Sequence, residues 1–134
     1  MAMNVSNELS DGLVSTARAG IGDTLRSVVY FTPETFEVLY VRKDLYDDAA
    51  AARAAKGALV DVERSGFVDG PAYAALAPDE AGPRFGEYEF TLRVFREGFV
   101  GRVVVDDHGV LVTTDEVDVG GFEEVAVTFR KLLA

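Results

Sequence analysis

The sequence predicts an α+β fold in which a single antiparallel sheet of about five strands packs against helices. Two observations support this fold class. Runs of β-branched and aromatic residues alternate with segments whose apolar residues recur at helical spacing. Short turn sequences separate several strand runs, as they do in antiparallel hairpins. The predicted order of elements is α-β-β-α-β-β-β-α, and we expect residues 1–134 to form one domain.

The first elements are predicted to be a helix and a pair of strands. Residues 4–20 show helical spacing and precede a Gly-Ile-Gly sequence that suits a helix C-terminus. Residues 25–31 have the composition of a strand. For residues 35–43 two alternatives remain, a second strand in a hairpin or a helix capped by Thr32. The composition of residues 36–41 favours the hairpin.

Residues 44–64 predict a second, alanine-rich helix. Its expected capping and first-turn acids are Asp44, Asp47 and Asp48. Its expected buried stripe is Ala52, Ala55, Leu59 and Val62. The following residues, 66–86, contain three of the four prolines and predict an irregular loop, either partly ordered or a mobile flap.

The C-terminal half is predicted to contain three strands and a last helix. The predicted strands are 87–96, 99–105 and 110–114, with turns at 97–98 and 107–109, and the helix is 120–134. The first turn places Leu92 opposite Val103, so that the apolar faces of the two strands coincide. The order of elements is similar to that of profilin-like and roadblock sandwiches, an analogy of fold that does not fix function.

Composition excludes several kinds of site. The 134 residues include no cysteine and one histidine, which excludes disulfides, thiol catalysis, iron–sulfur clusters and any site that needs two imidazoles. No run of 18 or more apolar residues marks a membrane span, and the first residues lack the features of a secretory signal. We therefore expect a cytoplasmic protein that has no membrane association and no cofactor.

The charge balance makes nucleic acid and anionic membranes unfavourable partners. Thirteen basic and 23 acidic residues give a formal net charge of −10, which repels nucleic acid and anionic lipid. The only lysines are Lys43, Lys56 and Lys131. Scarce lysine, abundant alanine and a strongly acidic composition are typical of proteins from a halophile cytoplasm.

Three sequence blocks resemble a known family. They lie at 26–45, 86–103 and 122–126. These blocks are similar to small acidic haloarchaeal proteins of uncharacterised function. The resemblance covers most of the chain outside residues 1–22 and 66–85, and it implies a halophile cytoplasm but no activity or site residues.

The strongest candidate for a ligand site is a pair of arginines. In the predicted register Arg93 and Arg102 stand directly opposite each other on one sheet face. Opposed like charges are unfavourable unless a negative group lies between them. That group is either a bound anion or an internal carboxylate, for which we consider Glu37, Glu89 and Glu123.

Other candidate sites are weaker. His108 is either a general base beside Asp106 and Asp107 or a residue tolerated in a hairpin turn, and the turn is favoured. These three residues make a poor metal site, and the acids at 44–48 lack the spacing of a calcium loop. Gly120 and Gly121 precede a helix without any nucleotide-binding motif, which favours a plain connection over an anion cradle. We therefore predict no metal site and no catalytic residue.

The sequence therefore favours a non-enzymatic module that acts through self-association or a protein partner. An exposed edge strand and a second apolar face with Val100, Val104 and Leu111 need cover, which a homodimer would provide. The alternative is a sensor of a small ligand or anion that uses Arg93 and Arg102.

Overall fold

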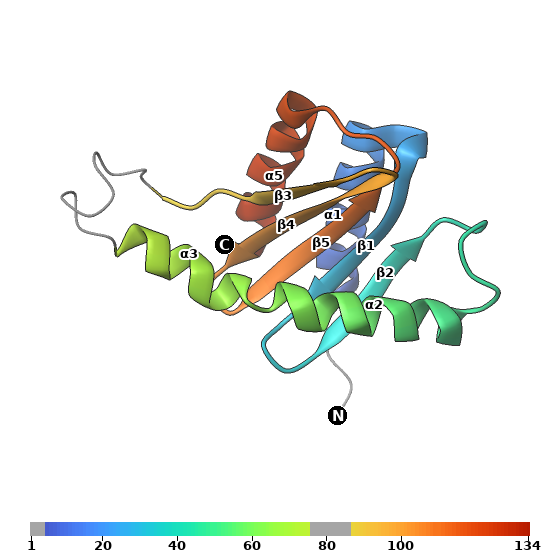
Figure 1. Ribbon diagram of the computed structural model, residues 1–134, viewed down its shortest axis with the longest axis horizontal. Helices are drawn as coiled ribbons and strands as arrows, with labels where there is room; N and C mark the ends of the chain where they lie inside the picture. The colour runs from blue at the N-terminus through green and yellow to red at the C-terminus, as the bar shows by residue number, and fades with distance from the viewer. Residues whose placement is uncertain (1–4, 76–86) are drawn as a thin grey trace.

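The computed structural model describes residues 5–75 and 87–134. A five-stranded antiparallel sheet in the order β2-β1-β5-β4-β3 forms the middle of the molecule (Figure 1). The strands are β1 (Leu25–Phe31), β2 (Phe36–Val41), β3 (Thr91–Phe95), β4 (Gly98–Val105) and β5 (His108–Thr114). The helices are α1 (Asn7–Ile21), α2 (Ala49–Glu63), α3 (Gly66–Ala74) and α5 (Val119–Leu133), with a short 3-10 turn at Gly22–Thr24. The predicted α+β class and the order of its elements are confirmed.

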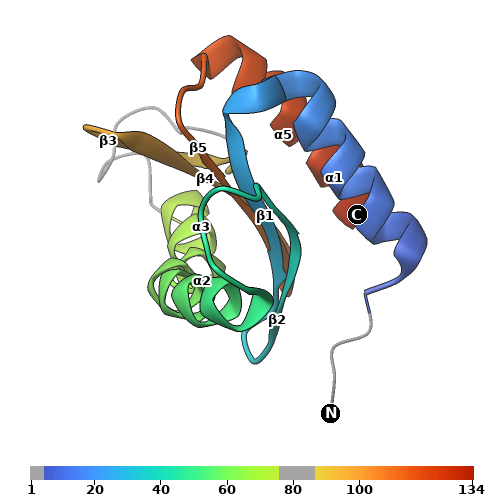
Figure 2. The ribbon, with the colours of Figure 1, turned by 90° about the vertical axis from the view of Figure 1, so that its right-hand side faces the viewer.

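Helices cover both faces of the sheet. Helices α1 and α5 lie together on one face, and α2 and α3 lie on the other (Figure 2). The larger core lies under α1 and α5, where Phe122 and Phe129 pack on Val103, Val110 and other buried residues of the sheet. Phe122 sits so close to β4 that a Cβ at position 101, occupied by Gly101, would lie 2.4 Å from its ring.

The smaller core lies under α2 and corrects one expectation. Val60 of α2 packs with Leu111 of β5, which is fully buried, and Val104 of β4 packs against the same cluster. Helix α2 therefore covers part of the second apolar face that we expected a partner to cover.

The first hairpin is as predicted. Strands β1 and β2 pair antiparallel with Phe31 opposite Phe36, and a bulge between Val28 and Val29 shifts the register further along. The strand alternative for residues 35–43 is therefore correct. The sequence Thr32–Thr35 closes the turn through a backbone bond from the Thr32 amide to the Thr35 carbonyl of 2.9 Å.

The register of the second hairpin differs from the prediction by two residues. Phe95 pairs with Gly98, so the turn is Arg96–Glu97 and not 97–98, and Leu92 lies opposite Gly101. Gly98 is required inside the strand because a Cβ there would lie 3.0 Å from the Thr114 carbonyl oxygen. A shift of two residues keeps each side chain on its predicted face, so the predicted faces are correct although the pairs are not.

The last hairpin turns one residue earlier than predicted. Val105 pairs with His108, so Asp106 and Asp107 form the turn and His108 begins β5. Asp106 adopts a φ of 54°, a left-handed conformation that aspartate tolerates better than most residues.

The segment between α2 and β3 contains a helix that the sequence analysis missed. Residues 66–74, predicted as irregular, form α3 with Pro71 inside it. The rest of the predicted loop, 76–86, lies outside the described residues. Helix α2 is also shorter than predicted and begins after Asp48, whose carboxylate accepts a 2.8 Å bond from the Ala51 amide.

The buried face of α2 also differs from the prediction. Its buried residues are Ala52, Lys56, Val60 and Glu63. Val62, expected inside, is 66% exposed. Two charged residues therefore occupy the face that packs on the sheet, which no apolar pattern can indicate. Among the described residues, no helix is long and apolar enough to cross a membrane.

Candidate functional site

The two predicted arginines meet at one buried carboxylate, Glu63. Glu63 is the last residue of α2, and its side chain is 2% exposed. Arg102 projects from β4 and donates from Nη1 to Glu63 Oε1 at 3.0 Å. Arg93 projects from β3 and donates from Nε to Glu63 Oε2 at 2.7 Å. The two carboxylate oxygens are thus divided between two strands.

Arg102 is held by further contacts. Its Nη1 also lies 3.3 Å from the Glu63 carbonyl and 3.4 Å from the Ser65 hydroxyl, and its Nη2 donates to the Thr91 hydroxyl at 3.0 Å. Its Nε is buried and has no hydrogen-bond partner among the described residues. Gly66 lies against the guanidinium, since a Cβ at that position would be 2.6 Å from Nε. The guanidinium is thus enclosed by the junction of α2 and α3.

Tyr88 fastens the strand side of the cluster. Its hydroxyl donates to the Arg102 carbonyl at 3.1 Å and lies 2.8 Å from the Thr91 hydroxyl. The Glu63 hydrogen bond, and then its charge, raise the pKa of Arg93 above its usual value, while burial opposes this shift. The cluster therefore brings two arginine side chains to one carboxylate.

The geometry corrects two expectations about these arginines. Arg102 lies opposite Thr91 and Arg93 lies opposite Val100, so the arginines are diagonal neighbours on one face and are not directly opposed. Their shared partner is Glu63, and not one of the three acids considered from the sequence. Of the two partners that the sequence allowed, a bound anion or an internal carboxylate, the structure thus places an internal carboxylate between the arginines. Glu63 escaped the sequence analysis because it is distant in sequence and sits on a helix face predicted to be apolar.

A second charge cluster joins β1, the end of β2 and the end of β5. The Asp115 carboxylate accepts from Arg26 Nε at 2.6 Å and from Arg42 Nη1 at 2.6 Å. Arg42 also donates to Asp44 at 2.7 Å, so Asp44 pairs with an arginine and does not cap α2. Hydrogen bonds from Arg42 and then Arg26 lower the pKa of Asp115, and the bonds to Asp115 and Asp44 raise the pKa of Arg42.

His108 uses both of its ring nitrogens in contacts within the fold. Its Nδ1 lies 2.9 Å from the Tyr30 hydroxyl, and its Nε2 lies 2.7 Å from the Leu133 carbonyl. Since a carbonyl only accepts, Nε2 carries a proton and donates to Leu133, while Nδ1 shares a hydrogen bond with the Tyr30 hydroxyl. Burial, and then the charge of Asp107, raise the pKa of Tyr30. His108 thus ties the end of α5 to the sheet, and both ring nitrogens are used.

The remaining candidates offer no ligand geometry. Gly120 and Gly121 lie inside the first turn of α5, where the Asp118 carboxylate accepts from the Gly121 amide at 2.9 Å. The helix N-terminus therefore already carries its own carboxylate. In the part of the chain that the structure describes, no group of three or more histidine, aspartate or glutamate side chains is placed to hold a metal ion.

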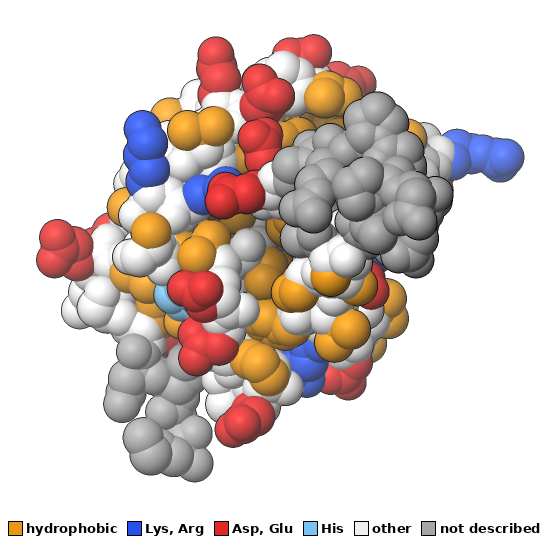
Figure 3. All heavy atoms as spheres, turned by 90° about the vertical axis from the view of Figure 1, so that its left-hand side faces the viewer, with side chains coloured by type: hydrophobic (Ala, Val, Ile, Leu, Met, Phe, Trp, Pro, Cys, Tyr) orange, Lys and Arg blue, Asp and Glu red, His pale blue; other side chains and the backbone are white. Residues whose placement is uncertain are grey.

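Another feature of the β3 side is an unpaired strand edge. Strand β3 is the last strand of the sheet, so one of its edges has no partner strand among the described residues. Val94 is 70% exposed and Phe95 is 58% exposed on this strand. Figure 3 shows the end of the molecule at which α3 lies, with hydrophobic side chains gathered between acidic ones.

Comparison with solved structures identifies proteins of the same fold. The gliding protein MglB from Thermus thermophilus superposes with a TM-score of 0.57 at 11% identity, over 98% of this chain and 95% of that one. An MglB with a tetrameric arrangement gives a TM-score of 0.57 at 12% identity, over 98% and 94%. Myxococcus xanthus MglB gives 0.52 at 10% identity, over 99% and 94%. At these identities the likeness establishes the fold, which is of the roadblock type that the order of elements suggested.

Sequence comparison gives the family. Among curated proteins, none is similar enough to count as a relative. One family model matches residues 11–134, which include every strand and most of α1. The chain therefore belongs to the family of the domain of unknown function DUF7522.

Proposed function

We propose that this protein is a non-enzymatic assembly module that self-associates through the free edge of β3. The observation that carries this proposal is an edge strand that has no partner strand in residues 5–75 and 87–134 and that exposes two apolar side chains, Val94 and Phe95. Such an edge is prone to pair with another chain unless charge, proline or a covering segment protects it. A second copy related by a two-fold axis can offer the same strand in antiparallel orientation.

The junction of α2 and α3 lies close to β3. Arg93 of β3 bonds to Glu63 at the end of α2, and both helices lie on the sheet face opposite α1 and α5 (Figure 2). They expose Val62 at 66% and Val68 at 70%. Antiparallel pairing of β3 with its copy would bring these helices near their counterparts and withdraw the apolar side chains from water.

The Glu63 cluster supports the proposal because it makes the edge rigid. Arg93 lies on β3 itself, and its bond to Glu63 fastens the edge strand to the end of α2. A preorganised edge loses less conformational entropy on association. One structure of the same fold is an MglB in a tetrameric arrangement, which shows an assembly built from this architecture in that protein.

Sedimentation of matched variants tests the proposal. We expect a dimer at micromolar concentration in high salt for the unmodified protein and a monomer for Val94→Asp, because two carboxylates would face each other across the edge. Val127→Asp makes the same change at an exposed site on α5 and should stay dimeric. A monomeric unmodified protein over the whole micromolar range, or equal loss of the dimer in both variants, would refute the β3 interface.

We also propose that the module works in the cytoplasm of a halophile. The net charge of −10 and the presence of only three lysines support this, as does the resemblance of three sequence blocks to haloarchaeal proteins. The test of this proposal is whether the Tm is higher in concentrated KCl than in dilute KCl.

A further inference from the structure

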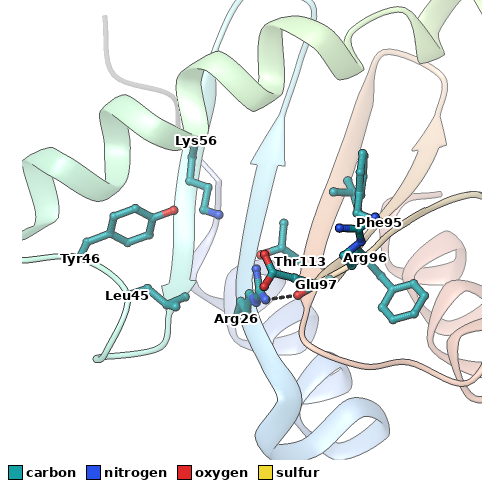
Figure 4. A pocket seen from close by; sticks show the side chains of 11 residues that line it. Arg26, Leu45, Tyr46, Lys56, Phe95, Arg96, Glu97 and Thr113 are labelled. Carbon is teal, nitrogen blue, oxygen red and sulfur yellow. Dashed lines mark hydrogen bonds between the residues drawn. The ribbon is translucent and has the colours of Figure 1, made fainter.

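A pocket of about 400 Å³ opens on the sheet face that carries α2 (Figure 4). Its walls are α2, the segment that precedes α2 and the β3–β4 hairpin. The lining residues are Arg26, Leu45, Tyr46, Lys56, Phe95, Arg96, Glu97, Gly98, Phe99, Val100 and Thr113. The volume lies within the range of about 300–1,000 Å³ that is typical of small-molecule sites.

Lys56 is the feature that points to a ligand. It is 6% exposed, and its side chain runs from α2 into the pocket, towards Tyr46 and the sheet (Figure 4). Its ammonium lies 5.6 Å from the centroid of the Tyr46 ring, and it forms no ion pair or hydrogen bond with any described residue. Its nitrogen is not one of the fully buried, unpartnered polar atoms of the described residues, so the ammonium reaches the open space of the pocket, where an anionic group can pair with it.

The other charged groups make the pocket positive. Arg96 stands in the β3–β4 turn and has no ion pair among the described residues, whereas Arg26 is paired with Asp115 at 2.6 Å. Among the described lining residues Glu97 is the one acid, and its backbone carbonyl accepts from Arg26. Two unpaired cations against one carboxylate form a local positive site on a chain of net charge −10. Such a site attracts a small anion.

The rest of the lining selects the body of the ligand. Leu45, Tyr46, Phe99 and Val100 supply apolar and aromatic surface. Thr113 lines the pocket from β5, and its hydroxyl is hydrogen-bonded to the Ser27 hydroxyl. An anionic group against Lys56 would thus be flanked by surface that binds an apolar body.

We propose that this pocket binds a small organic anion, with a carboxylate or phosphate at Lys56 and an apolar or aromatic body against Tyr46 and Val100. The site is independent of self-association through β3, although Phe95 borders both. Lys56 lies on the buried face of α2 and not on the exposed surface of the proposed interface. The two proposals can therefore fail separately.

Thermal melts and calorimetry at constant KCl concentration test the site, with phenyl phosphate, benzoate, inorganic phosphate and neutral phenol as probes. We expect phenyl phosphate or benzoate, at tenfold excess over its Kd, to raise the Tm of the unmodified protein by about 5 °C. Phenol should have no effect, and inorganic phosphate should bind at least about tenfold more weakly because it lacks the apolar body. Lys56→Met should lower the affinity for the organic anions at least about tenfold.

Lys131→Met is the matched control, since it removes the same charge from an exposed position on α5 and should bind as the unmodified protein does. Without any probe, Lys56→Met should melt close to the unmodified protein, because the ammonium faces the open space of the pocket and has no ion pair to lose among the described residues. Glu97→Gln should tighten binding by removal of the one competing carboxylate. Sedimentation of Lys56→Met should match that of the unmodified protein.

Three results would overturn the proposal. The first is no shift of Tm with either organic anion, and the second is an equal shift in Lys56→Met. The third is equal affinity for inorganic phosphate and phenyl phosphate, since the apolar lining would then contribute nothing.

Discussion

At the scale of single residues, Glu63 joins the end of α2 to β3 and β4 through its bonds to Arg93 and Arg102. The side chains of Glu63 and Arg102 are 2% and 3% exposed, whereas that of Arg93 is 40% exposed. Removal of one member of a buried pair leaves the other charged and unpaired, which costs more than loss of a solvent-exposed partner. The two arginines should therefore contribute unequally to stability although they share one carboxylate.

We expect Arg102→Ala to lower the free energy of unfolding by about 3–5 kcal/mol. Arg93→Ala should lower it by about 1 kcal/mol, because Arg93 is partly screened by solvent and Arg102 still neutralises Glu63. Urea unfolding measures both values. Arg96→Ala, at an exposed position without ion pairs among the described residues, should change stability by less than about 0.5 kcal/mol.

A double replacement shows whether the buried Glu63–Arg102 ion pair adds to the free energy of unfolding or only offsets the cost of burying its two charges. Glu63→Met combined with Arg102→Met replaces the buried charges by apolar groups of similar length, and it should recover most of the loss seen for Arg102→Ala alone. If the double variant is no more stable than Arg102→Ala, the pair itself is a net source of stability, contrary to this expectation.

The Asp115 cluster predicts a pH dependence. The pKa of Asp115 is lowered in the folded state by bonds from Arg42 and Arg26, from an ordinary value of 3.8. A carboxyl with a lowered folded-state pKa adds stability above 3.8, and this part is lost as the pH falls through the folded-state pKa. We expect Asp115→Asn to reduce the loss of stability as the pH falls below the ordinary carboxyl pKa of 3.8.

Chemical unfolding at a series of pH values measures this dependence. Asp23→Asn, which removes an exposed carboxyl without an ion pair among the described residues, should leave the profile close to that of the unmodified protein. Equal flattening in both variants would assign the effect to net charge and not to the Asp115 bonds.

At the scale of elements, the junction of α2 and α3 depends on a glycine. A Cβ at Gly66 would lie 2.6 Å from Arg102 Nε and 2.7 Å from its Cζ, which a buried guanidinium cannot easily avoid. A Cβ at Gly12, inside α1, would lie 3.5 Å from the Leu132 side chain, an ordinary contact. The same substitution should therefore have opposite effects in the two helices.

We expect Gly66→Ala to destabilise the fold by about 1–3 kcal/mol through overpacking. Gly12→Ala should stabilise it by about 0.5–1 kcal/mol, because alanine loses less backbone entropy in a helix interior. Thermal or urea unfolding of the two single variants decides this. A stabilised Gly66→Ala variant would mean that the Arg102 guanidinium has room to move away.

The first hairpin and the last helix were predicted with nearly the right bounds, whereas β3 begins four residues after the start of the predicted strand 87–96. Strands β1 and β2 have the predicted bounds, and α5 begins one residue before its predicted start. Helix α3 was missed because Pro71 and the glycines around it indicate a loop, whereas a helix of nine residues tolerates one missing amide bond. The β3–β4 register was wrong because Gly98 was assigned to the turn, and its real constraint is the nearby Thr114 carbonyl.

The site was predicted only on its strand side. Alternation placed Arg93 and Arg102 on one face, and the structure agrees. Helical spacing could not place Lys56 and Glu63, because apolar periodicity assigns charged residues to the solvent face by default. The signal available in the sequence was the pair of arginines itself, which required a negative group between them, either a bound anion or an acid from elsewhere in the chain.

At the scale of the whole molecule, the chain carries a net charge of −10, and the ion pairs of the described residues neutralise only some of its acids. Glu63 and Asp115 each form ion pairs with two arginines, so four arginines neutralise only two acids. Most acids of the described residues therefore have no ion pair, and Figure 3 shows acidic side chains distributed over one end of the molecule. Mutual repulsion of these groups disfavours the compact state.

Salt should relieve this repulsion. The screening length is about 10 Å at 0.1 M and about 3 Å at 1 M, so repulsion between surface carboxylates is largely removed at molar salt. We expect the Tm to be markedly higher in about 2 M KCl than in about 0.1 M KCl.

Concentrated salt can also strengthen apolar burial, so a control variant with fewer acids is needed. The control is the triple variant Asp11→Asn, Glu123→Gln, Glu124→Gln, whose three sites are exposed on α1 and α5. It should melt higher than the unmodified protein at low salt and gain less from added KCl. Equal Tm values at the two salt concentrations would make this an ordinary acidic protein, and an equal salt gain in the triple variant would assign the effect to apolar burial instead of charge.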